Sequence, residues 1–355
     1  MLRYNTEKEF LEGYLGDIQR NQNLGEEEYQ ILKKIISCEA FERIFGQTSI
    51  DEERIEQWKR ALNYKCSNLE KQCRYGRNEI KSPMWSNVSK YAKNESKYIQ
   101  KYSKRALMYL ILWQMFQDKG SELFEYIASK CVYKKIGKFG RAMPQSFCPI
   151  SPIQDLITGN LEKGKLYKYP PKDLRKKEEY NYGEDGKLLL YRHYRALEEK
   201  EDTIEFFFYI GEYILRIQYE ILSEKERAFQ VIRISMQQYD EEIISRTETA
   251  ELYPEGIDVF YIEELEFYEE GLKYINESYQ SVFIPGDNLS VMTNRREIYD
   301  FQKDEDGCLY GYKVSSWIGD GLVPSERKDR FYEISEKGKW DTQKGSGRWR
   351  RPDRV

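Results

Sequence analysis

Apolar side chains recur with two different periods along this chain, and the period changes near Leu166. Before that point Phe10, Tyr14 and Ile18 lie four residues apart, which places them on one face of an α-helix. After it, apolar and polar residues alternate, as in residues 215–221 (LRIQYEI), which is typical of a strand with one buried face. The sequence therefore predicts an α+β protein in which an N-terminal α-helical bundle precedes a large antiparallel β-meander.

Breaks in these patterns predict the domain boundaries. Residues 1–136 are expected to form the α-helical domain, and its later helices are expected over residues 49–69, 86–110 and 121–135. Glycine and proline then cluster over residues 137–165, which indicates a linker with one short helix. Residues 166–335 are expected to form the β-sheet domain, and residues 336–355 a basic tail.

An Asp-Gly pair occurs twice in similar surroundings within the expected sheet. Residues 182–188 (YGEDGKL) resemble residues 304–309 (DEDGCL), and Asp-Gly favours the positive φ angles of tight hairpins. This spacing resembles the hairpin units of tyrosine/aspartate repeat sheets. Together with the helical half, it is similar to uncharacterised cytoplasmic proteins of bacterial polymorphic-toxin loci, including immunity proteins. The resemblance implies an inhibitor of a toxin, and it assigns no functional residue.

Charge is segregated along the chain, although the formal net charge is only −4 and by itself indicates neither a nucleic acid nor a membrane as partner. Residues 59–105 contain thirteen Lys and Arg against three acids. Residues 240–270 contain twelve acids, and Arg246 is their single base. These two segments are the candidate binding surfaces.

The acidic segment combines carboxylates with aromatic rings, so it offers both long-range attraction for cations and apolar area for burial. On a strand, one face of this segment would carry the predicted partner-binding residues Asp258, Phe260, Glu264, Glu266, Tyr268 and Glu270. We expect this face to occlude a basic protein partner such as a toxin. Two alternatives are that the acids face the basic helices of the same chain, or that they form a solvated edge.

The basic segment offers an alternative function. Its cations could neutralise phosphates while neighbouring rings stack on bases, and the candidate nucleic-acid-binding residues are Arg74, Arg77, Lys90, Lys97, Lys101 and Arg105. No recognised nucleic-acid-binding module contains these residues, so we favour a solvated helix face over a nucleic-acid site.

Little in the sequence indicates catalysis or metal binding. His193 is the only histidine, which excludes any site that needs two imidazoles from one chain. The six cysteines include no CxxC pair, so we expect reduced thiols, no zinc site and no disulfide framework. We expect no catalytic residue and no cofactor. An enzyme with an unrecognised carboxylate site is a further alternative, because the chain has 61 acids.

The chain also shows no sign of export or membrane insertion. Its first residues are charged from Arg3 onward and have no apolar core, unlike a secretory signal. The longest apolar run, residues 106–116, is about 11 residues long, whereas a membrane-spanning helix needs about 20. We therefore expect a cytoplasmic protein without a membrane partner, in which this run forms a buried helix.

Overall fold

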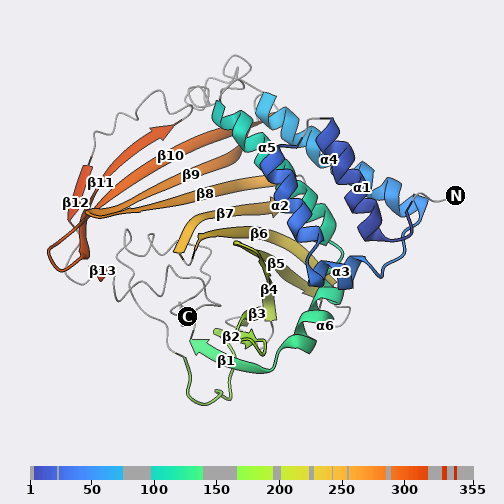
Figure 1. Cartoon of the computed structure of the whole chain (residues 1–355), viewed down its shortest axis with the longest axis horizontal. Coiled ribbons are helices and arrows are strands. Elements are labelled where there is room, and N and C mark those ends of the chain that lie inside the picture. The colour runs from blue at the N-terminus through green and yellow to red at the C-terminus, as the bar shows by residue number, and fades with distance from the viewer. Residues whose placement is uncertain are drawn as a thin grey trace.

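The computed structural model describes residues 4–21, 24–74, 97–138, 166–194, 201–223, 228–241, 243–253, 256–284, 289–318, 330–333 and 340–341. Figure 1 shows that the helices form a layer over one face of a long, curved antiparallel sheet. The α+β class and the antiparallel sheet predicted from the sequence are therefore confirmed. No helix within these ranges is long and apolar enough to cross a membrane.

The helices come first in the chain: α1 (Glu7–Arg20), α2 (Glu26–Ile36), α3 (Glu39–Phe45), α4 (Glu52–Arg74), α5 (Lys97–Phe116) and α6 (Gly120–Lys130). Helix α4 was expected to begin with Ser49 or Asp51 as its cap, and the cap is Asp51, whose carboxylate accepts a hydrogen bond of 2.8 Å from the backbone N–H of Arg54. The sequence analysis missed α3, because a helix of seven residues contains too few apolar positions to reveal a period.

The strands follow in order: β1 (Tyr133–Lys138), β2 (Lys177–Tyr182), β3 (Leu188–Tyr194), β4 (Glu201–Ile210), β5 (Tyr213–Ser223), β6 (Ala228–Asp240), β7 (Ile243–Tyr253), β8 (Gly256–Tyr268), β9 (Gly271–Ile284), β10 (Leu289–Lys303), β11 (Cys308–Ile318), β12 (Arg330–Glu333) and β13 (Trp340–Asp341). From β1 to β12 each strand pairs with the next in sequence, while β13 pairs with β11. The predicted meander is therefore confirmed, and its turns alternate between the two ends of the strands.

The β1 segment corrects the sequence analysis, which assigned it to the end of a helix and the start of a linker. Its residues pair antiparallel with β2 from Tyr133 to Lys138, so the sheet begins well before residue 166. Val132 and Tyr133 favour a strand and Gly137 disfavours a helix, but so short a segment shows no clear alternation. Residues 139–165, where the rest of the linker and its short helix were predicted, lie outside the described residues. So does the predicted basic tail, apart from β13.

The two Asp-Gly sequences form matching hairpin turns. The backbone N–H of Gly186 donates to the carbonyl of Gly183 at 3.1 Å, and Gly307 donates to Asp304 at 2.9 Å. Both glycines have a φ of +77°, whereas the aspartates before them do not have a positive φ. Each turn is therefore a type I turn that closes on a left-handed glycine, rather than a two-residue turn with two positive φ angles.

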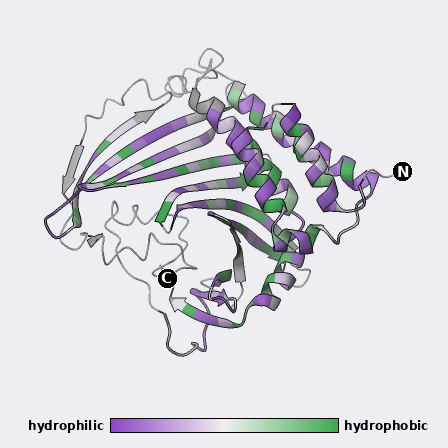
Figure 2. Cartoon of the chain, in the orientation of Figure 1, coloured by the Kyte–Doolittle hydropathy of each residue, from purple (hydrophilic) through white to green (hydrophobic). Residues whose placement is uncertain are grey.

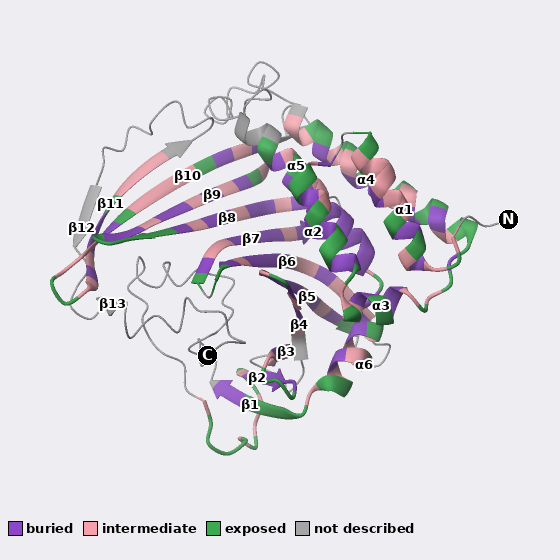
Figure 3. Ribbon diagram, in the orientation of Figure 1, coloured by how far each residue is buried: buried purple, intermediate pink, exposed green. Residues whose placement is uncertain are grey.

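The helices and the sheet share one hydrophobic core. It joins Leu32 of α2 and Tyr109 of α5 to Phe206, Ile217 and Phe260 of the strands. A smaller cluster covers the other face of the sheet and contains Ile214, Leu265, Leu272, Tyr274 and Phe301 among others. Hydrophobic and hydrophilic residues alternate along the strands in Figure 2, and the strands beneath the helices carry the most buried residues in Figure 3.

Helix α5 is the centre of this core. Its apolar run includes Ala106 and residues 108–112, whose side chains are fully buried between α4 and the sheet. The sequence prediction that this run forms a buried helix is confirmed. Because α5 crosses β6, β7, β8 and β10, it connects strands that are distant in the chain.

We predict that Phe260→Ala strongly destabilises the fold. The Phe260 side chain is fully buried, and its ring centroid lies 5.0 Å from that of Tyr109 and 5.6 Å from that of Tyr102. Truncation should lower the free energy of unfolding by about 3–5 kcal/mol. The control is Phe267→Ala on the same strand, where the ring is 40% exposed and the loss should stay under about 1 kcal/mol. Urea unfolding followed by circular dichroism measures both, and equal losses would contradict the prediction.

Candidate functional site

The residues predicted to bind a partner all lie on or directly after β8, but they occupy different environments. Phe260 is fully buried beneath α5 and cannot contact a partner, which corrects its assignment. The reason is that this face of β8 is turned toward the helices, so the Phe260 ring packs in the hydrophobic core. Asp258 and Glu264 are half-buried, and burial raises the pKa of Asp258, with Glu251 adding to the effect. Glu266, Tyr268 and Glu270 are exposed at the end of the strand.

A buried ionic cluster joins the helices to β7. The Arg105 guanidinium, 3% exposed, donates a hydrogen bond of 2.7 Å to the carboxylate of Glu248, which is 1% exposed. The Tyr109 hydroxyl donates to the same carboxylate at 3.0 Å, and Arg246 lies 2.7 Å from it. Arg246 also lies 3.4 Å from Glu264. At this point an acid of the acidic segment faces a base of the basic helices, as the intramolecular alternative proposed.

The charges of this cluster stabilise one another. Burial alone would raise the pKa of Glu248, but Arg105 and Arg246 outweigh it and hold that pKa below its ordinary value. Burial alone would likewise lower the pKa of Arg105, and the Glu248 carboxylate instead raises it. Both groups are therefore charged in the folded protein, and the cluster fixes the position of α5 against the sheet.

The exposed acids gather where β8 ends and where β10 turns into β11. We name this region the acidic tip surface; its exposed residues are Glu266, Phe267, Tyr268, Glu269, Glu270, Asp300, Glu305 and Asp306, and it also includes the half-buried Asp304. It lies at the left end of the long strands in Figure 1, where Figure 3 shows the end of β8 exposed. Sequence analysis found only its β8 part, because the turn after β10 is more than thirty residues away in the chain.

Hydrogen bonds hold the two turns of the acidic tip surface together. The Lys303 backbone N–H donates to the carbonyl of Glu270 at 3.0 Å, and its ammonium group donates to the carbonyls of Tyr268 and Glu269 at 3.2 and 3.3 Å. The Tyr268 hydroxyl donates to the Asp300 carboxylate. The two turns therefore form one connected surface.

Only some of these acids are balanced by cations of the same chain. Lys273 lies 2.8 Å from Glu266, as Arg246 does at 3.4 Å from Glu264, so these two predicted binding residues are partly neutralised. Among the described residues none forms an ion pair with Glu269, Glu270, Glu305 or Asp306. The electrostatic attraction of the surface therefore comes mainly from the turns and less from the middle of β8.

The alternative nucleic-acid-binding residues do not form one described surface. Arg105 is buried in its ionic cluster and is unavailable to phosphates. Arg74 ends α4, Lys97 begins α5, and Lys101 is exposed on α5. Arg77 and Lys90 lie outside the described residues.

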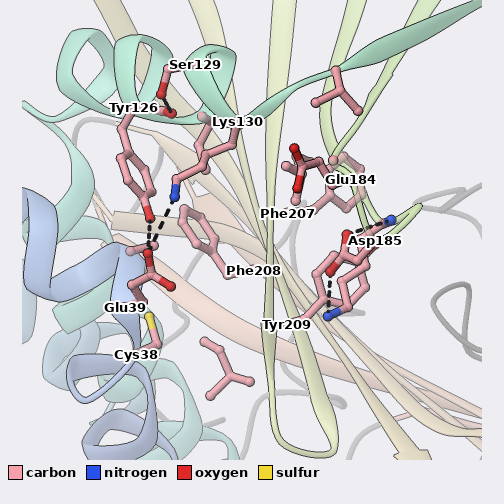
Figure 4. Close-up of a pocket in the computed structure, with 17 residues that line it drawn as sticks. Cys38, Glu39, Tyr126, Ser129, Lys130, Glu184, Asp185, Phe207, Phe208 and Tyr209 are labelled. Atoms are coloured by element: carbon pink, nitrogen blue, oxygen red, sulfur yellow. Dashed lines mark hydrogen bonds and ion pairs between the residues drawn. The ribbon is translucent and has the colours of Figure 1, made fainter.

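A cavity of about 580 Å³ opens between α3, α6 and the β2–β3 turn (Figure 4). Glu39 contributes from α3, Tyr126 and Lys130 from α6, Asp185 from the turn and Phe208 from β4. The Glu39 carboxylate accepts a hydrogen bond of 3.3 Å from the Tyr126 hydroxyl. No motif in the sequence indicates this cavity, because its walls come from segments that only the fold brings together.

The five described cysteines are half-buried free thiols, and Cys148 lies outside the described residues. Cys66 and Cys73 line a second cavity of about 530 Å³ between α1, α4 and α5, where burial raises the pKa of Cys66 to about 11 and that of Cys73 to about 12. His193 lies in β3, opposite Glu178 of β2 and Thr203 of β4. The described residues include no group of three or more side chains that could hold a metal ion.

Comparisons with known proteins do not identify the chain. No family model matches it, and no curated protein matches it. Among solved structures it is similar to a protein of unknown function from Bacteroides fragilis NCTC 9343, with 11% identity over 40% of this chain and 91% of that chain, at a TM-score of 0.23. A TM-score this low carries no argument about fold or function.

We predict that Glu248→Gln destabilises the protein and flattens its response to acid. Because the folded-state pKa lies below the ordinary 4.5, the stability from this charge is present above that pH and lost as the pH falls through the folded-state value. The variant leaves the buried Arg105 without its main partner, which should cost about 3–5 kcal/mol at neutral pH. Urea unfolding at several pH values between 7 and 3 measures both effects.

The control for this prediction is Glu251→Gln. Glu251 pairs with Arg233 at 2.7 Å, but its side chain is 30% exposed, so the loss should stay under about 1 kcal/mol. An acid response of Glu248→Gln as steep as that of the unmodified protein would show that Glu248 does not stabilise the fold electrostatically.

Proposed function

We propose that this chain is a protein-binding protein that holds a basic partner on its acidic tip surface and acts as an immunity-type inhibitor in the cytoplasm. The observation that carries the proposal is the juxtaposition of exposed rings with carboxylates that form no ion pair with any described residue. Glu269 and Glu270 follow directly after Phe267 and Tyr268, whose side chains are 40% and 38% exposed.

The carboxylates supply attraction at long range. Glu269, Glu270, Glu305 and Asp306 are held in two neighbouring turns, so their potentials add and raise the rate of encounter with a cationic surface. The rings supply affinity at short range, because aromatic side chains are typical anchors of protein interfaces. Together they favour a folded basic protein over a small cation, which would not bury the rings.

The surface is also largely preorganised. Lys303 bridges the two turns through its hydrogen bonds to Tyr268, Glu269 and Glu270, so the turns need little further ordering when a partner binds. Less conformational entropy is then lost on association, which favours tighter binding for the same contacts.

Occlusion is the proposed mechanism. Proteins that act on nucleic acids hold phosphates with Lys and Arg, and an acidic surface can cover those cations in place of the substrate. The resemblance to proteins of polymorphic-toxin loci supports this role. The nucleic-acid alternative is less favoured, because Arg105 is buried and the acidic tip surface would repel phosphates.

We predict that reversing the charges of the acids in the two turns of the acidic tip surface weakens partner binding. The variant is Glu269→Lys, Glu270→Lys, Glu305→Lys and Asp306→Lys together. The partner is first captured from the cells that make the protein, identified by mass spectrometry and purified, and binding is then measured by surface plasmon resonance. Affinity should fall more than about tenfold at low salt and less at high salt, because salt screens exposed charges.

The matched control reverses Glu12, Glu53, Glu70 and Glu122, which are exposed on the helices and give the same change in net charge. It should bind almost as the unmodified protein does. Equal losses for the two variants would mean that net charge alone governs binding, and an unaffected tip variant would place the interface elsewhere.

We predict that Phe267→Ser weakens partner binding in a way that salt does not alter. The substitution removes apolar area from the interface and leaves the charge of the surface unchanged. Tyr253→Ser, at the opposite end of the strands with a side chain 55% exposed, is the control and should not change the affinity. Plasmon resonance at low and high salt checks this, and an effect that disappears at high salt would contradict it.

A further inference from the structure

The cavity of Figure 4 carries the same three chemical groups on two walls. On one wall the Lys130 ammonium lies 3.6 Å from the Glu39 carboxylate and 5.6 Å from the centre of the Tyr126 ring. On the other wall the Lys187 ammonium lies 2.9 Å from the Asp185 carboxylate and 5.5 Å from the centre of the Tyr209 ring. Each wall therefore offers a cation and an anion beside an aromatic face.

Apolar side chains line about half of the space between these walls. Figure 4 shows Phe208 between the two groups, and the further apolar lining residues are Ala40, Ile127, Val132, Leu189, Phe207 and Ile210. A volume of about 580 Å³ lies within the range of small-molecule sites, which are apolar with a few polar groups that orient the ligand. The cavity therefore suits a ligand with an apolar body and charged ends.

The charge pairing restricts which ends fit. A ligand carrying only a cation would pair with a carboxylate and gain nothing from the lysines, and a ligand carrying only an anion would pair with a lysine and gain nothing from the carboxylates. A zwitterion can pair with a carboxylate and a lysine at the same time. The Lys130 and Glu39 side chains are 52% and 73% exposed, and their separation exceeds a hydrogen bond, so they can turn to new partners at little cost.

We propose that this cavity binds a short peptide with free termini and apolar side chains. Its ammonium group binds the carboxylate on one wall, its carboxylate binds the lysine on the other, and its side chains lie against Phe208 and Leu189. This site is separate from the acidic tip surface, since it is built from α3, α6 and β2 to β4.

The test is isothermal titration calorimetry of the full chain with the dipeptide L-leucyl-L-leucine and two analogues. N-acetylation removes the ammonium group and C-terminal amidation removes the carboxylate, while both leave the side chains unchanged. The free dipeptide should bind at least tenfold more tightly than either analogue. An amide that binds as tightly would show a cation site, an acetylated form that binds as tightly would show an anion site, and no binding of the free dipeptide would overturn the proposal.

Variants locate the site. Lys130→Met and Lys187→Met should each weaken binding of the free dipeptide, and Ala40→Trp should abolish it by filling the cavity while keeping every charge. The matched control is Lys34→Met, because Lys34 lies 2.6 Å from Glu212 and 5.3 Å from the centre of the Tyr213 ring, outside the cavity. Melting temperatures show that each variant is folded. Binding that survives Ala40→Trp, or that is lost equally in Lys34→Met, would contradict the assignment.

Discussion

The burial of α5 against the sheet is the contact on which the rest of the structure depends. A wide antiparallel sheet needs at least one covered face, and α5 covers the strands from β6 to β10 with side chains that are almost wholly buried. The Arg105 and Glu248 pair lies within this contact. Apolar burial supplies the stabilising energy there. The ionic pair fixes the position of the helix on the sheet, because a shifted helix would leave two charges buried without partners.

The same contact decides which part of the acidic segment is exposed. Where β8 passes under α5 its residues serve the core, as Phe260 does, and Arg246 balances the neighbouring acids Glu248 and Glu264. Beyond the helices the strand continues and its side chains become exposed: Glu266 pairs with Lys273, and no described residue forms an ion pair with Glu269 or Glu270 in the turn that follows. A segment that looks uniform in sequence thus occupies two environments, buried beneath the helices and exposed beyond them.

The sequence was sufficient to predict features that repeat along the chain. It was insufficient to predict contacts between residues that are distant in the sequence. The strand period, the meander and the paired Asp-Gly turns follow from local spacing, as does the buried run in α5. The short elements α3 and β1 were missed, because a few residues do not show a period. The burial of Phe260 and the cavity beside Glu39 depend on which face each strand turns to the helices, and no local pattern contains that information.

The topology also explains why both proposed sites lie beside hairpin turns at one end of the strands. In a meander every second turn falls at the same end of the strands, so the turns after β2, β4, β6, β8 and β10 lie at one end of the sheet. Turns favour short polar residues and glycine, and in this chain the polar residues are mostly acids, such as Asp185, Glu212, Glu241, Glu270 and Asp306. The strand order itself therefore places the acidic turns together at one end of the strands. The exposed rings at one turn and the cavity at another distinguish the proposed protein-binding surface from the proposed peptide site at that end of the strands.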